Sequence, residues 1–201
     1  SPDGQTILYS MAVAGNTDVY KVSASGGAPV RLTTAPGIDV GGSFSPDGKQ
    51  IVFESDRSGS QQLYVMNADG SNQRRISFFG GRAATPEWSP RGDQIAFTHM
   101  AGNFRIAVTD PSGRNMRFLT DSWQDEAPTW SPNGRIVQFF RTARSSGKAP
   151  ACQQSVLRKR RRTAAPRARP AEMTSGYDDE QDLATDHEKI EIPAFLRRQA
   201  N

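Results

Sequence analysis

The sequence predicts an all-β chain, a partial β-propeller of about three four-stranded blades followed by a disordered C-terminal tail. Three observations predict it. One turn tetrapeptide recurs at spacings of 44, 44 and 42 residues, and short segments of alternating apolar residues follow each copy. The charge balance then changes abruptly after residue 141. Four short strands per repeat of this length are typical of a propeller, whereas helical repeats need apolar residues at helical spacing.

The recurring turn begins with Ser-Pro and ends with Gly. Proline fixes φ at the second position, Asp or Asn suits the third, and glycine accepts the positive φ that closes the turn. The four copies lie at residues 1–4, 45–48, 89–92 and 131–134. Because the first copy opens the chain, we expect the sequence to begin inside a repeat, without an initiating Met or a signal peptide.

Each of the first three turns is followed by three strand signals, and a fourth leads into the next turn; the last turn is followed by one. The first segments are 6–9, 51–53, 95–97 and 136–139; the second are 18–22, 62–66 and 105–108; the third end at 32–33, 76–77 and 119–120. We therefore expect three strands of one blade in residues 1–38 and two whole blades in 39–81 and 82–124. Residues 125–141 begin a further blade.

The charge pattern separates the tail from the repeats. Residues 1–141 hold 13 basic and 13 acidic residues, 142–171 hold nine basic and no acidic ones, and 172–201 hold three basic and eight acidic ones. Oppositely charged blocks with few apolar residues are typical of a solvated segment. We expect the propeller to end at residue 141 and residues 142–187 to form a disordered linker, with no membrane-spanning segment anywhere in the sequence.

The residues that could carry chemistry are scattered. His99 and His187 have no partners at metal-ligand spacing, and the single cysteine, Cys152, excludes an internal disulfide. No Gly-x-Ser-x-Gly elbow is present, and the basic run 158–162 lacks the aromatic residues that stack on bases. The sequence predicts no enzyme, metal or cofactor, and no nucleic-acid partner.

Three longer motifs are more specific than the turn alone: Glu-Ser-Asp-Arg-Ser-Gly at 54–59, Thr-Pro-Glu-Trp-Ser-Pro-Arg-Gly at 85–92 and Ala-Pro-Thr-Trp-Ser-Pro-Asn-Gly-Arg at 127–135. With these motifs, residues 1–141 resemble the propeller repeats of the TolB family. The resemblance implies a periplasmic, non-enzymatic binding protein of the Tol–Pal cell-envelope system, with the lipoprotein Pal and other Tol proteins as partners. The propeller of a prolyl-oligopeptidase-type peptidase, which shares the general repeat motif, remains an alternative.

In such propellers the loops that enter the innermost strand line the mouth of a funnel. Because these are mostly polar, convergent loop positions on a rigid scaffold, we expect them to contact the partner, with ordinary solvated loops as the alternative at each position. The matching positions are Asp39, Gly41, Arg82, Ala84, Thr85, Gln124, Asp125 and Glu126.

The last 12 residues, 190–201, resemble the C-terminal docking peptide of the division protein FtsZ. The resemblance implies that residues 188–201 dock on division-anchor proteins through a small apolar and basic set. The expected docking residues are Ile190, Ile192, Pro193, Phe195, Leu196 and Arg197. Because FtsZ is cytoplasmic and TolB periplasmic, the two resemblances together imply a chimeric reading frame, with a true gene fusion as the alternative.

Overall fold

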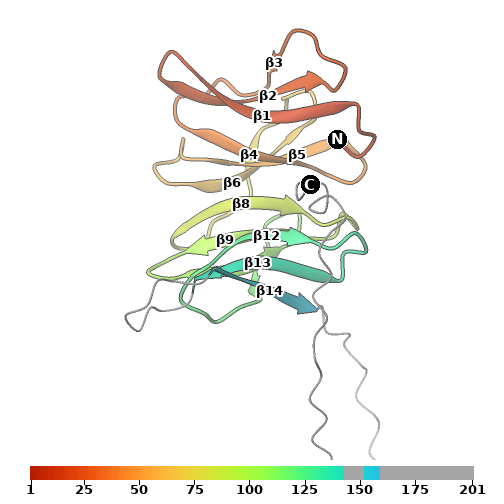
Figure 1. Cartoon of the computed structure of the whole chain (residues 1–201). Coiled ribbons are helices and arrows are strands. Elements are labelled where there is room, and N and C mark those ends of the chain that lie inside the picture. The colour runs from red at the N-terminus through yellow and green to blue at the C-terminus, as the bar shows by residue number, and fades with distance from the viewer. Residues whose placement is uncertain (143–151, 159–201) are drawn as a thin grey trace, which may run out of the picture. The chain divides into compact units, whose positions relative to one another are not determined.

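The computed structural model describes residues 1–142 and 152–158, which form fourteen strands in four antiparallel sheets (Figure 1). Sheet 1 contains β1 (Thr6–Val13), β2 (Asn16–Ser23) and β3 (Val30–Arg31). Sheet 2 contains β4 (Asp39–Phe44), β5 (Gln50–Ser55), β6 (Gln62–Asn67) and β7 (Arg74–Arg75). Sheet 3 contains β8 (Arg82–Trp88), β9 (Ile95–Met100), β10 (Phe104–Thr109) and β11 (Arg117–Phe118). Sheet 4 contains β12 (Asp125–Trp130), β13 (Ile136–Thr142) and β14 (Cys152–Arg158).

The predicted fold class, a partial propeller, is confirmed. Within each sheet, every strand pairs antiparallel with the next strand in the chain, so sheets 2 and 3 are four-stranded meanders that fall within the expected blades 39–81 and 82–124. Sheet 1 supplies the three strands expected from residues 1–38. Within the described residues, no helix is long and apolar enough to cross a membrane.

The last blade extends beyond residue 141, where we expected the repeat to end. Strand β14 lies within the expected linker and pairs with β13 from Thr142↔Cys152 to Ile136↔Arg158. The added strand satisfies backbone groups on an edge of β13 that would otherwise stay unpaired. The sequence did not predict β14, because no glycine turn lies at the repeat spacing and the surrounding composition is basic. The remainder of the expected linker and the whole tail peptide lie outside the described residues.

The Ser-Pro turns form as predicted. In each turn the glycine N–H donates to the carbonyl oxygen of the serine, at 2.8–2.9 Å, and the glycine φ lies between 64° and 71°. The turns span residues 1–4, 45–48, 89–92 and 131–134. A residue with a side chain is strained at such a φ, which explains why glycine ends every copy.

The apolar core lies between neighbouring sheets. Successive side chains of a strand point to opposite faces, so each sheet can pack on both neighbours. In β5, Ile51 and Phe53 belong to the cluster shared with sheet 1, whereas Val52 belongs to the cluster shared with sheet 3. Sheet 3 in turn contributes Ile106 to the cluster that contains Phe139 of sheet 4. Burial on both faces is why the central strands are almost continuously apolar.

The short outer strands are fastened by hydroxyl groups. In each of sheets 1 to 3, a backbone N–H of the strand next to the outer strand (β2, β6 or β10) donates to a Thr or Ser side chain just after that outer strand. The three bonds are Val19 to Thr33 Oγ1 (3.0 Å), Leu63 to Ser77 Oγ (2.8 Å) and Ile106 to Thr120 Oγ1 (3.0 Å). They extend pairing beyond the two-residue ladders of the outer strands, and they explain the recurring Leu-Thr and Ile-Ser pairs.

Each of the innermost strands β4, β8 and β12 contains a β-bulge at the same position of the repeat. Register shifts between Val40 and Ser43 in β4, and at the matching positions of β8 and β12. The fourth residue before each Ser-Pro serine has a positive φ: Gly41 at 69°, Thr85 at 50° and Ala127 at 51°. Only the first of these is glycine, and a positive φ at a non-glycine residue costs about 1–3 kcal/mol, so the surrounding structure must hold the other two in place.

Candidate functional site

The loops that lead into the innermost strands lie at one end of the sheets. We call this end the rim; it comprises loops 34–38, 78–81 and 121–124 with the first residues of β4, β8 and β12. Each loop bonds to the sheet that it leaves, near the start of the strand next to the outer one (β2, β6 or β10). Gly37 N–H donates to Asn16 Oδ1, Gln62 Nε2 donates to the Gly81 carbonyl, and Phe104 N–H donates to the Trp123 carbonyl, each at 2.9 Å.

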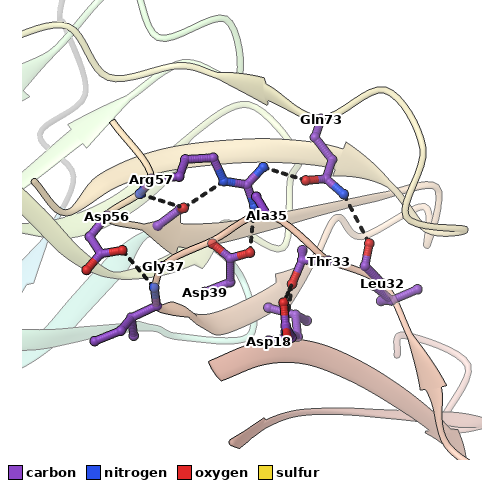
Figure 2. Close-up of polar contacts among 12 residues, drawn as sticks. Asp18, Leu32, Thr33, Ala35, Gly37, Asp39, Asp56, Arg57 and Gln73 are labelled. Carbon is purple, nitrogen blue, oxygen red and sulfur yellow. Dashed lines mark hydrogen bonds and ion pairs between the residues drawn. The ribbon is translucent and has the colours of Figure 1, made fainter. Parts of the chain in front are cut away.

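Asp39, which we expected to contact a partner, is a buried structural residue. Its carboxylate pairs with Arg57, whose Nη2 lies 2.6 Å from Asp39 Oδ2 (Figure 2). Arg57 also donates from Nε to Ser55 Oγ at 2.8 Å and from Nη1 to Gln73 Oε1 at 2.7 Å. Gln73 in turn donates to the Leu32 carbonyl of sheet 1 at 3.0 Å. The cluster therefore fixes the start of β4 and ties sheet 2 to sheet 1.

Asp125 occupies the matching place in sheet 4 and is also fully buried. Arg141 donates two hydrogen bonds to its carboxylate, 2.7 Å from Nε to Oδ1 and 3.1 Å from Nη2 to Oδ2. Burial opposes ionisation of Asp125, but the hydrogen bonds and the charge of Arg141 outweigh it and hold the pKa of this carboxyl below its usual value. Asp125 therefore stays charged and shapes the rim from within.

The other expected contact residues lie at least partly in solvent. Gly41, Arg82 and Thr85 are exposed, and Ala84, Gln124 and Glu126 are half-buried. Arg82 donates from Nε to Gln61 Oε1 at 3.0 Å, and Gln124 donates to Glu126 Oε1 at 3.2 Å. These six residues are placed where a partner can reach them.

Three exposed apolar residues on the rim were not among the residues that we expected to contact a partner. Ile38 is 48% exposed, Phe78 is 73% exposed and Trp123 is 53% exposed, and one lies in each loop. Arg75 Cζ lies 5.0 Å from the centre of the Phe78 ring, over its face. A signal was present, since Ile38 directly precedes β4 and Trp123 lies two residues before β12. Periodicity could not separate them from strand residues that point inward.

His99 supports the central loop of the rim. The ring is buried, and its Nε2 lies 2.7 Å from the Gly80 carbonyl oxygen. It packs between Phe79, at 5.3 Å, and Phe118, at 5.2 Å between ring centres. No group of three or more His, Cys, Asp or Glu side chains among the described residues could hold a metal ion. His99 therefore acts as a packed aromatic residue that holds loop 78–81.

The comparison with protein families decides which propeller this is. A family model described as the TolB β-propeller domain matches residues 1–166. The chain belongs to the TolB β-propeller family. The match includes β14, in agreement with a last blade that continues past residue 141.

Similar proteins from other bacteria support membership of the TolB family. The Tol-Pal system protein TolB 1 of Novosphingobium aromaticivorans is 75% identical over 71 residues, 35% of this chain and 16% of that protein. The Tol-Pal system protein TolB of Rhizorhabdus wittichii is 66% identical over 53 residues, 26% of this chain and 12% of that protein. The matched segments thus cover well under two thirds of these relatives.

Solved structures show the same fold. The crystal structure of TolB from Acinetobacter baumannii has a TM-score of 0.68 and 31% identity, covering 79% of this chain and 39% of that one. Puromycin hydrolase has a TM-score of 0.63 at 17% identity, covering 79% of this chain and 26% of that one. The second likeness is one of fold alone, and the TolB resemblance is the closer of these two.

Proposed function

We propose that this chain is a propeller segment of a periplasmic Tol–Pal protein that acts by binding a Pal-like lipoprotein at the rim, without catalysing a reaction. The observation that carries the proposal is the exposed apolar residue in each of the three rim loops, Ile38, Phe78 and Trp123. The names of the relatives supply the system to which the partner belongs.

The rim has the composition of a protein-binding surface. Aromatic side chains and arginine are enriched at the energetic centres of interfaces, where a polar border surrounds apolar anchors. Phe78 and Trp123 are the aromatic anchors here, and Arg82, Gln124 and Glu126 add hydrogen-bonding groups to the same rim. The buried pairs of Asp39 and Asp125 keep the strand ends fixed, so little order has to be gained on binding.

A peptidase function is supported less well. The peptidase-like neighbours share the fold at low identity, and a propeller of that kind accompanies a separate hydrolase domain. The rim itself offers apolar anchors rather than a nucleophile next to a general base.

Calorimetric titration of the 201-residue chain with the soluble domain of Pal from Novosphingobium aromaticivorans tests the proposal. We expect Phe78→Ala and Trp123→Ala each to weaken binding by at least about tenfold, the loss typical of an aromatic anchor. Val30→Ala is the matched control, because Val30 is 51% exposed but lies on the outer strand β3. Absence of binding by the unaltered chain, or equal affinity of all three variants, would overturn the proposal.

We also propose that residues 188–201 are a separate docking peptide for a division anchor, as the resemblance of residues 190–201 to the FtsZ C-terminus implies. Ile190, Ile192, Phe195 and Leu196 form its apolar set. A synthetic 188–201 peptide should bind a division-anchor protein, and Phe195→Ala should abolish that binding. Because the two compartments conflict, sequencing the locus should reveal a break between residues 141 and 172; a continuous, expressed gene would contradict a chimeric origin.

A further inference from the structure

The strained bulges of the inner strands are held by side chains of the preceding blade. Glu54 on β5 and Thr98 on β9 occupy the same place in the repeat, nine residues after the serine of the turn. Ala127 N–H in β12 donates to Thr98 Oγ1 at 3.1 Å, and the backbone N–H of Thr85 in β8 faces the Glu54 carboxylate and lowers its pKa. The same kind of interaction therefore crosses two successive blade junctions, with two chemically different acceptors.

Each bond ends on the strained residue of its blade. Thr85 and Ala127 are the two non-glycine residues with positive φ in the inner-strand bulges. A bulge leaves its extra residue out of the strand ladder, so the N–H of that residue needs another acceptor. Glu54 and Thr98 supply one each, and both are buried, with 7% and 3% of their surface exposed. Solvent therefore competes little for the bond.

A second bond fixes the other end of each bulge. Ser43 Oγ of β4 accepts from Trp88 N–H at 3.1 Å. In the next blade Trp130 Nε1 donates to the Glu87 carbonyl oxygen at 3.1 Å, and Thr129 Oγ1 donates to the Glu87 carboxylate at 3.1 Å. The inner strand of a blade is thus held by the blade before it on both sides of the bulge.

The rim residues sit beside the residues that are held in this way. Ala84 and Thr85 lie at the bulge of β8, and Glu126 precedes the held residue of β12. Thr85 Oγ1 also lies 2.8 Å from Thr98 Oγ1, so one threonine of β9 contacts the bulge of its own blade and that of the next. A change at Glu54 or Thr98 therefore reaches the rim of the following blade.

We propose that Glu54 and Thr98 are positioning residues of the rim, each of which fixes the bulge conformation of the next blade through the backbone N–H that it accepts. This positioning role depends on the proposed function only for the identity of the partner that the rim binds. The two residues touch no partner themselves. They act through the inner strand, so the rim of one blade depends on the identity of a buried side chain in its neighbour.

Amide hydrogen exchange of the ¹⁵N-labelled 201-residue chain tests the mechanism without a partner. Thr98→Val removes the acceptor of the Ala127 amide, and Glu54→Met removes that of the Thr85 amide. We expect each variant to accelerate exchange of its own amide by roughly five- to tenfold, as the loss of one hydrogen bond predicts, and to leave the other unchanged. Thr98→Ser and Glu54→Gln retain an acceptor oxygen and should leave both amides unchanged.

The Leu63 amide is the internal reference, because its acceptor, Ser77 Oγ, is untouched in every variant. Acceleration of Leu63 together with the target amide means general loosening and overturns the proposal. Faster exchange of the target amide in only one of the two variants, or in neither, also overturns the proposal. Thr98→Ala and Glu54→Ala must give the same pattern, and they replace Thr98→Val and Glu54→Met if those variants do not fold.

Titration with the soluble Pal domain links the mechanism to the rim. We expect Thr98→Val and Glu54→Met to weaken Pal binding by roughly fivefold while Thr98→Ser and Glu54→Gln bind normally, because a loosened site loses preorganisation. Unchanged affinity in variants whose amides exchange faster would overturn the positioning role. If the unaltered chain does not bind Pal, the proposed function fails, and the exchange pattern still decides whether the two residues fix the bulges.

Discussion

The guanidinium of Arg57 joins parts of the chain that are far apart in the sequence. It pairs with the buried Asp39 of β4, bonds Ser55 at the end of β5, and reaches Gln73 just before β7. A planar group with several donors suits this task, because each donor meets a different acceptor in a fixed geometry. The start of β4 at the rim is therefore set by one side chain (Figure 2).

Replacing Arg57 with alanine leaves the Asp39 carboxylate buried without its cation. We expect Arg57→Ala to lower the free energy of unfolding by about 3–5 kcal/mol, as breaking a buried pair does. Arg74→Ala, at an exposed position of the outer strand β7, is the control and should change it by less than about 0.5 kcal/mol. Urea denaturation measures both; equal stabilities of the two variants would contradict a structural role for the pair.

Glu54 makes stability depend on pH in a defined direction. Burial raises the pKa of Glu54 above its ordinary value of 4.5, against the opposing effects of the Thr85 N–H and the Arg82 charge. A raised folded-state pKa gives stability that is present in full below 4.5 and is lost as the pH rises through the raised pKa. The ionised carboxylate of Glu54 therefore destabilises the folded state.

Glu54→Gln removes this ionisation and keeps an oxygen that can accept from Thr85. We expect the variant to be more stable than the unaltered chain at pH 8, because it buries no charge at this position. The difference should shrink or vanish at pH 4. Urea denaturation at both pH values measures it; a variant that is less stable at pH 8 would contradict the account.

At the scale of the strand, the bulge in β12 stores strain at Ala127. Its φ of 51° suits glycine, so Ala127→Gly should stabilise the chain by about 0.5–1 kcal/mol, the relief of left-handed backbone less the extra chain entropy of glycine. Ala12→Gly in β1 is the control, because Ala12 is exposed and has no positive φ. It should destabilise by about 0.5–1 kcal/mol. Thermal unfolding compares the two; the same sign for both would contradict the strain.

The elements also show which parts of the structure the sequence could reveal. Proline, Asp or Asn, and glycine stand where the Ser-Pro turns need them, and apolar alternation marks the strands, so the blades were predictable. The bulges were not, because Thr85 and Ala127 carry no signal of a positive φ. The partners of Asp39 and Asp125 lie 18 and 16 residues away, so their burial depended on the register of the sheet. Strand β14 had neither a glycine turn at the repeat spacing nor clear alternation.

For the whole molecule, the four sheets pack face to face in chain order, so that each junction repeats the same kind of apolar cluster (Figure 1). Stability in such repeats comes from each blade and its contacts with its neighbours. The inner strands β4, β8 and β12 run from the rim to the Ser-Pro turns, so the two ends of these strands differ in chemistry. The rim presents apolar anchors, whereas the other end presents tight turns of Ser, Pro and Gly.

This polarity gives the most direct test of the central claim that the rim binds the partner. Hydrogen–deuterium exchange of the 201-residue chain should be compared with and without the soluble Pal domain, at a Pal concentration about 100 times its Kd. We predict slower exchange in loops 34–38, 78–81 and 121–124, and no change in the turns at 45–48, 89–92 and 131–134. Protection confined to those turns, or to the outer strands β3, β7 and β11, would contradict the claim.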